Sequence, residues 1–229
     1  MGDFHAASAH FPEPWRQINF DDDIPATQYT LRNWDGVNAV SAVAEASMAL
    51  LARPLSVDLA NTPMLCWRWR IESTVGSADL RRKSGDDYAA RVYVAFAIPT
   101  EQKGFGLRSK LKLGRMLFGD QVPDAAINYV WDNLNPIGTR APNAYTDRTQ
   151  IIVTRSGNGD AGKWQSERRN VLSDAHSAFP NVDLSTVSLA IGSDTDNTGE
   201  TVRAGFAELH FVGSEEPCEF TELELRAEG

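Results

Sequence analysis

An alternation of apolar and polar residues over positions 65–71 constrains the fold more than any other feature of this sequence. It reads Leu-Cys-Trp-Arg-Trp-Arg-Ile. Successive side chains on a β-strand point to opposite faces, so Trp67 and Trp69 share one face while Arg68 and Arg70 share the other. The pattern predicts a strand with one face in an apolar core and a cationic outer face.

A second alternating segment at 89–98 puts its valines on one side and Arg91 and Tyr93 on the other. If the two strands pair with their apolar faces aligned, four polar residues gather on one outer face: Arg68, Arg70, Arg91 and Tyr93. Guanidinium groups bind carboxylates and phosphates through paired hydrogen bonds. Several arginines on one face therefore require anions among them, either internal acids such as Asp86 and Asp87 or an acidic ligand.

Short strand-like segments separated by Gly, Pro, Asn and Asp turns continue to residue 212. They predict an all-β fold, a jelly-roll-like antiparallel β-sandwich resembling carbohydrate-binding modules. Asp35-Gly36 indicates a hairpin, and the ambiguous segment 42–51 is expected to be a strand. One or two short helices are expected, a basic amphipathic one at 104–119 and another at 173–179.

We expect a single β-sandwich domain over 15–212, between a flexible N-terminal arm at 1–14 and an acidic C-terminal tail at 213–229. No apolar run reaches the ~18 residues of a membrane span, and no signal peptide is evident at the start. The two cysteines, Cys66 and Cys218, are expected to be unpaired thiols, because a disulfide would need the tail to fold back.

The composition, with 42% hydrophobic residues and a formal net charge of -9, supports a folded core. It argues against a nucleic-acid partner, which needs a basic surface.

Two segments combine aromatic, amide, acidic and arginine side chains, which is the set that carbohydrate sites use. The first ends in Asp132 and Asn133, and the second contains Tyr145, Asp147 and Arg148. We expect these polar residues either to bind a ligand or only to shape the turns. The aromatic residues of the first segment, Tyr129 and Trp131, are expected in the core.

Oxygen-bearing side chains also fill the segment 193–199, which reads Ser-Asp-Thr-Asp-Asn-Thr-Gly. This resembles the start of a calcium loop, with Asp194, Asp196 and Asn197 as candidate metal ligands. The distal glutamate of an EF-hand is missing, so the expected calcium site is of another kind. The alternative is a β-turn whose side chains bond to the backbone.

Five motifs in order resemble the bacterial domain of unknown function 3047 family. They are Trp-Arg-Trp-Arg at 67–70, Asp-Leu-Arg-Arg-Lys-Ser-Gly-Asp-Asp-Tyr-Ala-Ala-Arg-Val-Tyr-Val at 79–94, Tyr-Val-Trp-Asp-Asn at 129–133, Asn-Ala-Tyr-Thr-Asp-Arg at 143–148 and Asp-Thr-Asp-Asn-Thr-Gly at 194–199. The resemblance covers about 15–212 and implies no activity. It implies a periplasmic or cell-envelope setting, because many relatives carry secretion signals. It also places twelve candidate positions within family motifs: Lys83, Asp86, Asp87, Tyr88, Arg91, Asp132, Asn133, Tyr145, Arg148, Asp194, Asp196 and Asn197.

Together these features predict a binding protein for a glycan or another acidic, hydroxyl-rich ligand. Three groups of residues would make the contacts, namely arginines for anionic groups, tyrosines for stacking, and acids and amides for hydroxyls: Arg68, Arg70, Lys83, Asp86, Asp87, Tyr88, Arg91, Tyr93, Asp132, Asn133, Tyr145, Asp147 and Arg148. One alternative is a lyase or glycosidase acting on polysaccharide through paired carboxylates or Tyr145. A third is a structural module that binds no small ligand.

Overall fold

The computed structural model describes residues 1–2, 4–5, 8, 10–102 and 123–222. The helix expected at 104–119 lies outside these ranges. The strands, in chain order, are β1 (Arg16–Ile18), β2 (Gln28–Trp34), β3 (Val37–Glu45), β4 (Met48–Pro54), β5 (Met64–Ile71), β6 (Ala90–Ala97), β7 (Ala125–Asp132), β8 (Arg140–Pro142), β9 (Thr149–Ser156), β10 (Gln165–Asn170), β11 (Ser185–Asp194) and β12 (Thr201–Val212). The described helices are η1 (Lys83–Gly85), η2 (Thr100–Gln102) and α2 (Val171–Ala178).

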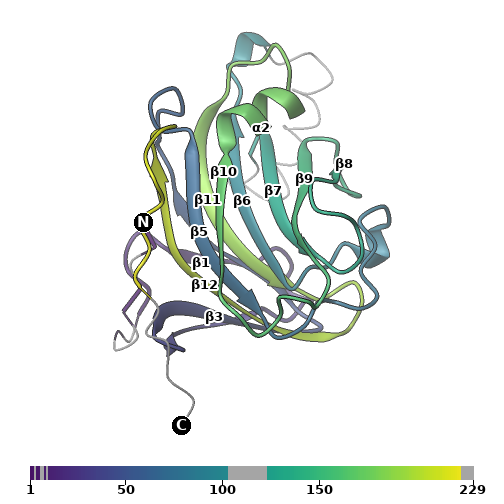
Figure 1. Cartoon of the computed structure of the whole chain (residues 1–229). Helices are drawn as coiled ribbons and strands as arrows, with labels where there is room; N and C mark the ends of the chain where they lie inside the picture. Colours follow the sequence, from purple (N-terminus) through teal and green to yellow (C-terminus); the bar gives the residue numbers. More distant parts are fainter. Residues whose placement is uncertain (3, 6–7, 9, 103–122, 223–229) are drawn as a thin grey trace.

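The strands form two sheets that face each other across an apolar core (Figure 1). The 7-stranded sheet has the order β1-β4-β11-β6-β7-β9-β8, and the 5-stranded sheet has the order β10-β5-β12-β3-β2. Neighbouring strands are antiparallel except β7 and β9, which run parallel. The prediction of a jelly-roll-like β-sandwich is confirmed. None of the helices in the described part of the chain has the length and apolar character needed to span a membrane.

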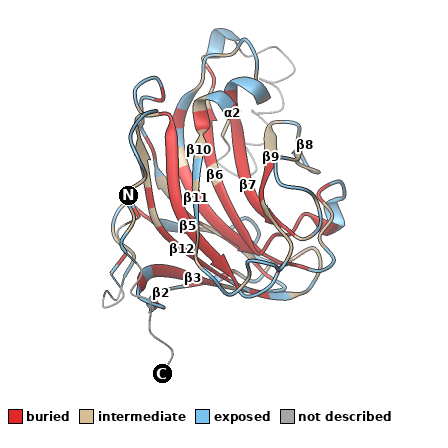
Figure 2. Cartoon of the chain, viewed as in Figure 1, coloured by how far each residue is buried: buried red, intermediate tan, exposed pale blue. Residues whose placement is uncertain are grey.

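Tryptophans of β5 fill the space between the sheets, as the alternation predicts. Trp67 and Trp69 are fully buried and meet edge to face, with ring centroids 5.4 Å apart. Each also packs on an aromatic residue of β7 in the opposite sheet: Trp67 on Tyr129 at 5.4 Å and Trp69 on Trp131 at 5.7 Å. These contacts join the two layers, and the buried strand interiors are visible in Figure 2. Aromatic pairs of this kind add about 0.5–1.5 kcal/mol each beyond the area that they bury.

The expected pairing of the two central strands is wrong. β5 pairs with β10 and β12, whereas β6 pairs with β11 and β7 in the other sheet. Residues 72–89 lead the chain from one layer to the other, so the two apolar faces meet across the core instead of lying side by side. Arg68 and Arg70 consequently lie on the outer face of one sheet, and Arg91 and Tyr93 on the outer face of the other. The single arginine-rich face does not form.

The predictions made from local sequence signals agree with the structure better than the predicted strand pairing does. Asp35 and Gly36 both have positive φ, 52° and 85°, in the two-residue turn that joins β2 to β3. This is the backbone of the favoured hairpin turn, and Asp-Gly is a preferred pair for it. The ambiguous segment 42–51 lies in strands β3 and β4. Helix α2 begins two residues before the expected Ser173, because the Asn170 side chain caps it by accepting from the Ser173 N–H.

Both ends of the described chain contact the sandwich. Gly2 exchanges backbone hydrogen bonds with β12, from its N–H to Leu209 at 3.0 Å and from the Glu208 N–H to its carbonyl at 3.2 Å. Phe4 is buried against Trp15, with ring centroids 5.6 Å apart. The described part of the arm is therefore anchored to the sandwich at these residues.

The expectation of two unpaired thiols is wrong, because Cys66 and Cys218 form a disulfide. We call residues 213–222 the C-terminal strap. It folds back over the outer face of β5, where the Arg68 guanidinium donates to the Thr221 carbonyl at 2.7 Å and lies 4.8 Å from the Phe220 ring centroid. No periodicity in the strap sequence signals this return, which is why the pairing was not predicted.

Candidate functional site

Three segments that are far apart in the sequence meet where β6 begins and β11 ends, at one end of the 7-stranded sheet. They are the segment from η1 to β6, the turn between β8 and β9, and the loop between β11 and β12. We call the four carboxylates that they bring together the acidic cluster: Asp86, Asp87, Asp194 and Asp196. Asp86, Asp87 and Asp194 are buried and Asp196 is half-buried. Most of the candidate residues in the family motifs lie here.

Arg91 is the internal counter-ion of the acidic cluster. Its Nε donates to Asp194 Oδ1 at 2.6 Å, and its Nη2 contacts both Asp194 Oδ2 and the Asp86 carbonyl oxygen. Its Nη1 donates to the Tyr93 hydroxyl at 2.7 Å, and its guanidinium lies 4.6 Å from the Tyr88 ring centroid. Because all three nitrogens are engaged inside the protein, this guanidinium is not free to meet an external anion.

Asp87, Asp194 and Asp196 each place one carboxylate oxygen within 4.8 Å of the other two. Asp87 accepts hydrogen bonds from the backbone of the loop between β11 and β12. Its Oδ2 accepts from Asn197 N at 3.1 Å and from Thr198 N at 2.7 Å. The loop at 193–199 was a candidate calcium site from its sequence. The structure adds Asp87 to it from a position more than a hundred residues earlier.

Burial and crowding raise the pKa values of two members of the acidic cluster, Asp194 and Asp196. Burial raises the pKa of the Asp194 carboxyl well above its ordinary value, and although Arg91 opposes this rise, the nearby acids Asp87, Asp86 and Asp196 add to it. Burial also raises the pKa of Asp196, and Asp87 raises it further. Carboxylates crowded in this way are stabilised by a proton, a cation or hydrogen-bond donors.

Tyr145 marks the exposed edge of the acidic cluster. Its hydroxyl donates to Asn197 Oδ1 at 2.6 Å and lies 3.2 Å from the Lys83 carbonyl oxygen, yet the residue is 56% exposed. The Lys83 Nζ lies 5.1 Å from the ring centroid. Burial of the hydroxyl, followed by the charges of Asp196, Asp86 and Asp87, raises the pKa of Tyr145, so this hydroxyl keeps its proton at neutral pH.

Two carboxylate oxygens of the acidic cluster retain acceptor capacity. Asp86 Oδ2 accepts from Asn143 Nδ2 at 2.6 Å, but Asp86 Oδ1 is buried without a hydrogen-bond partner among the described residues. Asp196 Oδ2 accepts from Asn197 Nδ2 at 2.6 Å, and Asp196 Oδ1 is likewise buried and without a partner in that part of the chain. Buried polar atoms in native proteins are normally bonded, so such oxygens indicate a donor or cation that binds there.

The arginines of β5 are remote from the acidic cluster, and each has internal partners. Arg68 pairs with Glu208 at 3.1 Å and with the C-terminal strap. Arg70 pairs with Asp35, donates to the Gly162 carbonyl at 2.8 Å and lies 4.3 Å from the Trp34 ring centroid.

The candidate ligand-binding residues at the end of β7 form hydrogen bonds that shape turns. Asp132 Oδ1 accepts from Leu134 N at 2.7 Å, and Asn133 Nδ2 donates at 3.0 Å to the carbonyl oxygens of Gly76 and Ala78. Asp132 thus holds its own turn, and Asn133 fastens the connection that leads to η1. In the turn between β8 and β9, Arg148 Nε donates to the Asp124 carbonyl at 2.8 Å, and Asp147 is exposed.

Sequence reasoning missed Asn143, which bridges two parts of the site. Its Nδ2 donates to Asp86 and its Oδ1 accepts from the Tyr145 N–H at 2.9 Å. Its position two residues before Tyr145 in a turn was the available signal, since asparagine commonly bonds to the backbone two residues on.

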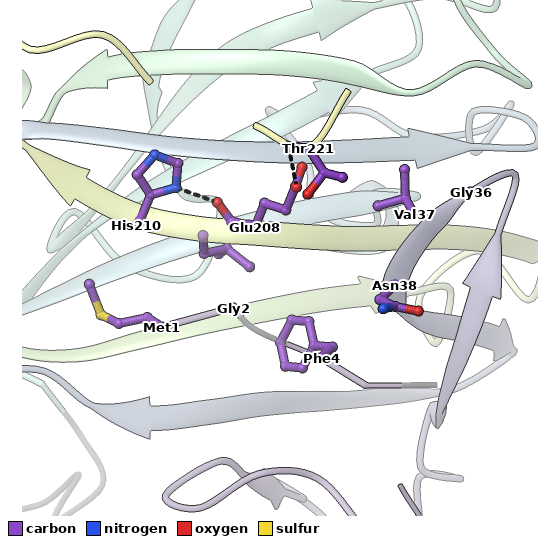
Figure 3. Close-up of a pocket in the computed structure, with 10 residues that line it drawn as sticks. Met1, Gly2, Phe4, Gly36, Val37, Asn38, Glu208, His210 and Thr221 are labelled. Atoms are coloured by element: carbon purple, nitrogen blue, oxygen red, sulfur yellow. Dashed lines mark hydrogen bonds between the residues drawn. The ribbon is translucent and has the colours of Figure 1, made fainter. Parts of the chain in front are cut away.

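A separate hollow of about 260 Å³ lies where the N-terminal residues meet the bulge of β12. Figure 3 shows Met1 and Phe4 on one side, and Glu208, His210 and Thr221 on the other. Its polar groups bond to each other or to the strap: His210 Nδ1 lies 2.6 Å from the Glu208 carbonyl oxygen, and Glu208 Oε1 accepts from Thr221 N at 2.8 Å. These bonds hold the strap against β12 and indicate a structural role for the polar groups of the hollow.

Comparison with protein families gives a match over residues 13–210 to a family described as "Protein of unknown function (DUF3047)". The chain belongs to the DUF3047 family. This confirms the resemblance drawn from the motifs, and the matched range contains every member of the acidic cluster. A comparison with curated proteins found no match.

Solved structures with a similar course of the chain include three carbohydrate-active proteins at 10–12% identity. The xyloglucanase domain of NopAA, a type three effector from Sinorhizobium fredii, in complex with cellobiose, has a TM-score of 0.40, with 88% of this chain and 98% of that chain covered. Endoglucanase 3 from family GH12 of Trichoderma harzianum gives 0.39, with 82% and 85% covered. A family 12 xyloglucanase from Bacillus licheniformis in complex with ligand gives 0.37, with 92% and 90% covered.

Proposed function

We propose that this DUF3047 protein binds a neutral, hydroxyl-rich ligand, such as a glycan, at the acidic cluster beside Tyr145. The observation that carries the proposal is the pairing of an exposed, anchored aromatic ring with buried carboxylate oxygens that lack partners. Tyr145 supplies the apolar platform, and Asp86 and Asp196 supply acceptors.

Each part of this arrangement matches a feature of sugars. The apolar C–H face of a sugar ring packs on an aromatic ring, and sugar hydroxyls donate to carboxylates in charge-assisted hydrogen bonds. Tyr145 is fixed at its hydroxyl end by Asn197, so little side-chain freedom is lost when a ligand stacks on it.

The charge of the site favours a neutral ligand over an acidic one. The site contains four carboxylates and one buried guanidinium, and that guanidinium already has internal partners. Arg68 and Arg70, which the sequence suggested as anion binders, lie on the opposite outer face of the sandwich and are also paired. An anionic sugar would therefore meet net repulsion here.

The disulfide supports an oxidising location for this protein. Structural disulfides form and persist outside the reducing cytosol, and Cys66–Cys218 joins positions 152 residues apart. We therefore propose the periplasmic or cell-envelope setting that the family resemblance implied.

No observation favours the enzymatic alternatives. A lyase that used Tyr145 as its base would need a lowered phenol pKa, whereas the pKa of Tyr145 is raised. Asp132, a carboxylate that a glycosidase could use, is instead engaged by backbone N–H groups of its own turn.

The test is a glycan array of neutral and acidic saccharides probed with the full chain and with Tyr145→Ala. We expect wild type to bind neutral glycans and Tyr145→Ala to lose roughly 5–10-fold in affinity, since stacking on an aromatic ring contributes about 1–1.5 kcal/mol. Leu134→Ala is the control, because Leu134 is also large and apolar and is 81% exposed, but lies in the turn after β7. Equal binding by Tyr145→Ala and wild type, or binding of acidic glycans alone, would contradict the proposal.

A further inference from the structure

We infer that the acidic cluster holds one divalent cation of the hard, oxygen-preferring kind, Ca²⁺, between Asp87, Asp194 and Asp196. The inference rests on the proposed function only in that both use this cluster. The cation site itself is argued from the three carboxylates and from a fourth, Asp86, that lies beside the same guanidinium as Asp194.

The spacing of the oxygens suits calcium. Ca²⁺ binds oxygen at about 2.3–2.6 Å, so ligands on one ion lie up to about 5 Å apart. The three oxygens of Asp87, Asp194 and Asp196 lie within 4.8 Å of one another. Mg²⁺ requires shorter bonds in a stricter octahedral arrangement, so it is the comparison ion in the test below.

Asp86 provides a further observation that supports a cation near the acidic cluster. Its side chain is only 7% exposed, and its Oδ1 has no hydrogen-bond partner among the described residues. Oδ2 points to Asn143, whereas Oδ1 lies 3.9 Å from Arg91 Nη2, the same nitrogen that contacts Asp194. This oxygen therefore lies beside the Arg91 guanidinium that also binds Asp194, and Asp86 is one of the acids that act on Asp194 electrostatically.

The net negative charge of the site favours binding of a cation. When all are ionised, the four carboxylates of the acidic cluster and the Arg91 guanidinium carry a net charge of about -3, which a divalent cation reduces to about -1. The backbone donors that hold Asp87 come from Asn197 and Thr198, so an ion between Asp87 and Asp196 would also fix the loop that anchors Tyr145. Cation binding thus prepares the platform for the proposed ligand.

The test uses the full chain, stripped with EDTA and dialysed, and CaCl₂ alone as the probe. For an affinity on the order of 10⁻⁴–10⁻³ M, we expect 5 mM Ca²⁺ to raise Tm by roughly 2–8 °C, with a smaller rise for Mg²⁺. Asp196→Asn should lose the response, and because Asp196 is half-buried this variant should still fold. Asp147→Asn, which removes an exposed carboxylate outside the cluster, should keep the response.

Calcium titration calorimetry on the same three proteins provides the second readout. An unchanged Tm together with no heat of binding for stripped wild type, or a full response in Asp196→Asn, would overturn the inference. Saccharide binding is measured separately in saturating Ca²⁺. A calcium response without glycan binding would remove the proposed function and leave the cation site standing, and glycan binding without a calcium response would do the reverse.

Discussion

We expect Arg91→Met to lower the free energy of unfolding by about 3–5 kcal/mol, because the substitution leaves buried carboxylates without their counter-ion. Arg91 has a side chain that is 3% exposed, and it contacts Asp194 through two nitrogens while also binding Tyr93. Methionine preserves much of the side-chain volume, so the loss reports chiefly on charge and hydrogen bonding. Urea unfolding followed by tryptophan fluorescence measures the effect.

Arg82→Met is the matched control for Arg91→Met. Arg82 also pairs with an aspartate, Asp79, at 3.4 Å, but its side chain is 77% exposed. An exposed pair of this kind contributes about 0–1 kcal/mol, so this variant should unfold close to wild type. Adding Asp194→Asn to Arg91→Met should recover part of the loss, since it removes one of the unpaired charges. A change below ~1 kcal/mol in Arg91→Met would show that Arg91 does not neutralise the cluster.

Cys218→Ser has the second large expected effect, a loss of about 2–5 kcal/mol in stability. The disulfide closes a loop of 152 residues, which restricts the unfolded chain strongly in the chain-entropy account. Its loss also frees the C-terminal strap, including the Thr221 carbonyl that accepts from Arg68. Urea unfolding of wild type and Cys218→Ser, with and without dithiothreitol, measures this loss in the free energy of unfolding.

The reductant supplies the control for Cys218→Ser. Dithiothreitol should lower the stability of wild type to that of Cys218→Ser and leave the variant unchanged. If wild type unfolds at the same urea concentration with and without reductant, under conditions where mass spectrometry shows both thiols free, the strap does not stabilise the sandwich.

The sequence predicts which side chains are buried better than it predicts which side chains share an outer face. Alternation places Trp67 and Trp69 in the core because side-chain direction follows from the strand itself. The partners of each strand do not follow from it, and β5 and β6, although consecutive, lie in opposite sheets. The predicted arginine-rich face assumed that β5 and β6 pair. It is wrong because residues that point outward from two different sheets cannot share a face.

The candidate site was predicted in pieces. The loop with Asp194 and Asp196, the Asp86-Asp87 pair and Tyr145 were each recognised from local composition. Their convergence depends on β6 pairing with β11, which no local pattern reports. The return of the C-terminal strap was missed for the same reason, because a contact between Cys66 and Cys218 is a property of the tertiary fold.

The most direct measurement is a crystal structure of the full chain grown with Ca²⁺ and the neutral saccharide that binds best on the array. We expect an ion among Asp87, Asp194 and Asp196, and sugar density against the exposed ring of Tyr145 within hydrogen-bond distance of the acidic cluster. Saccharide density in the hollow between the two chain ends, with the acidic cluster unchanged, would contradict it.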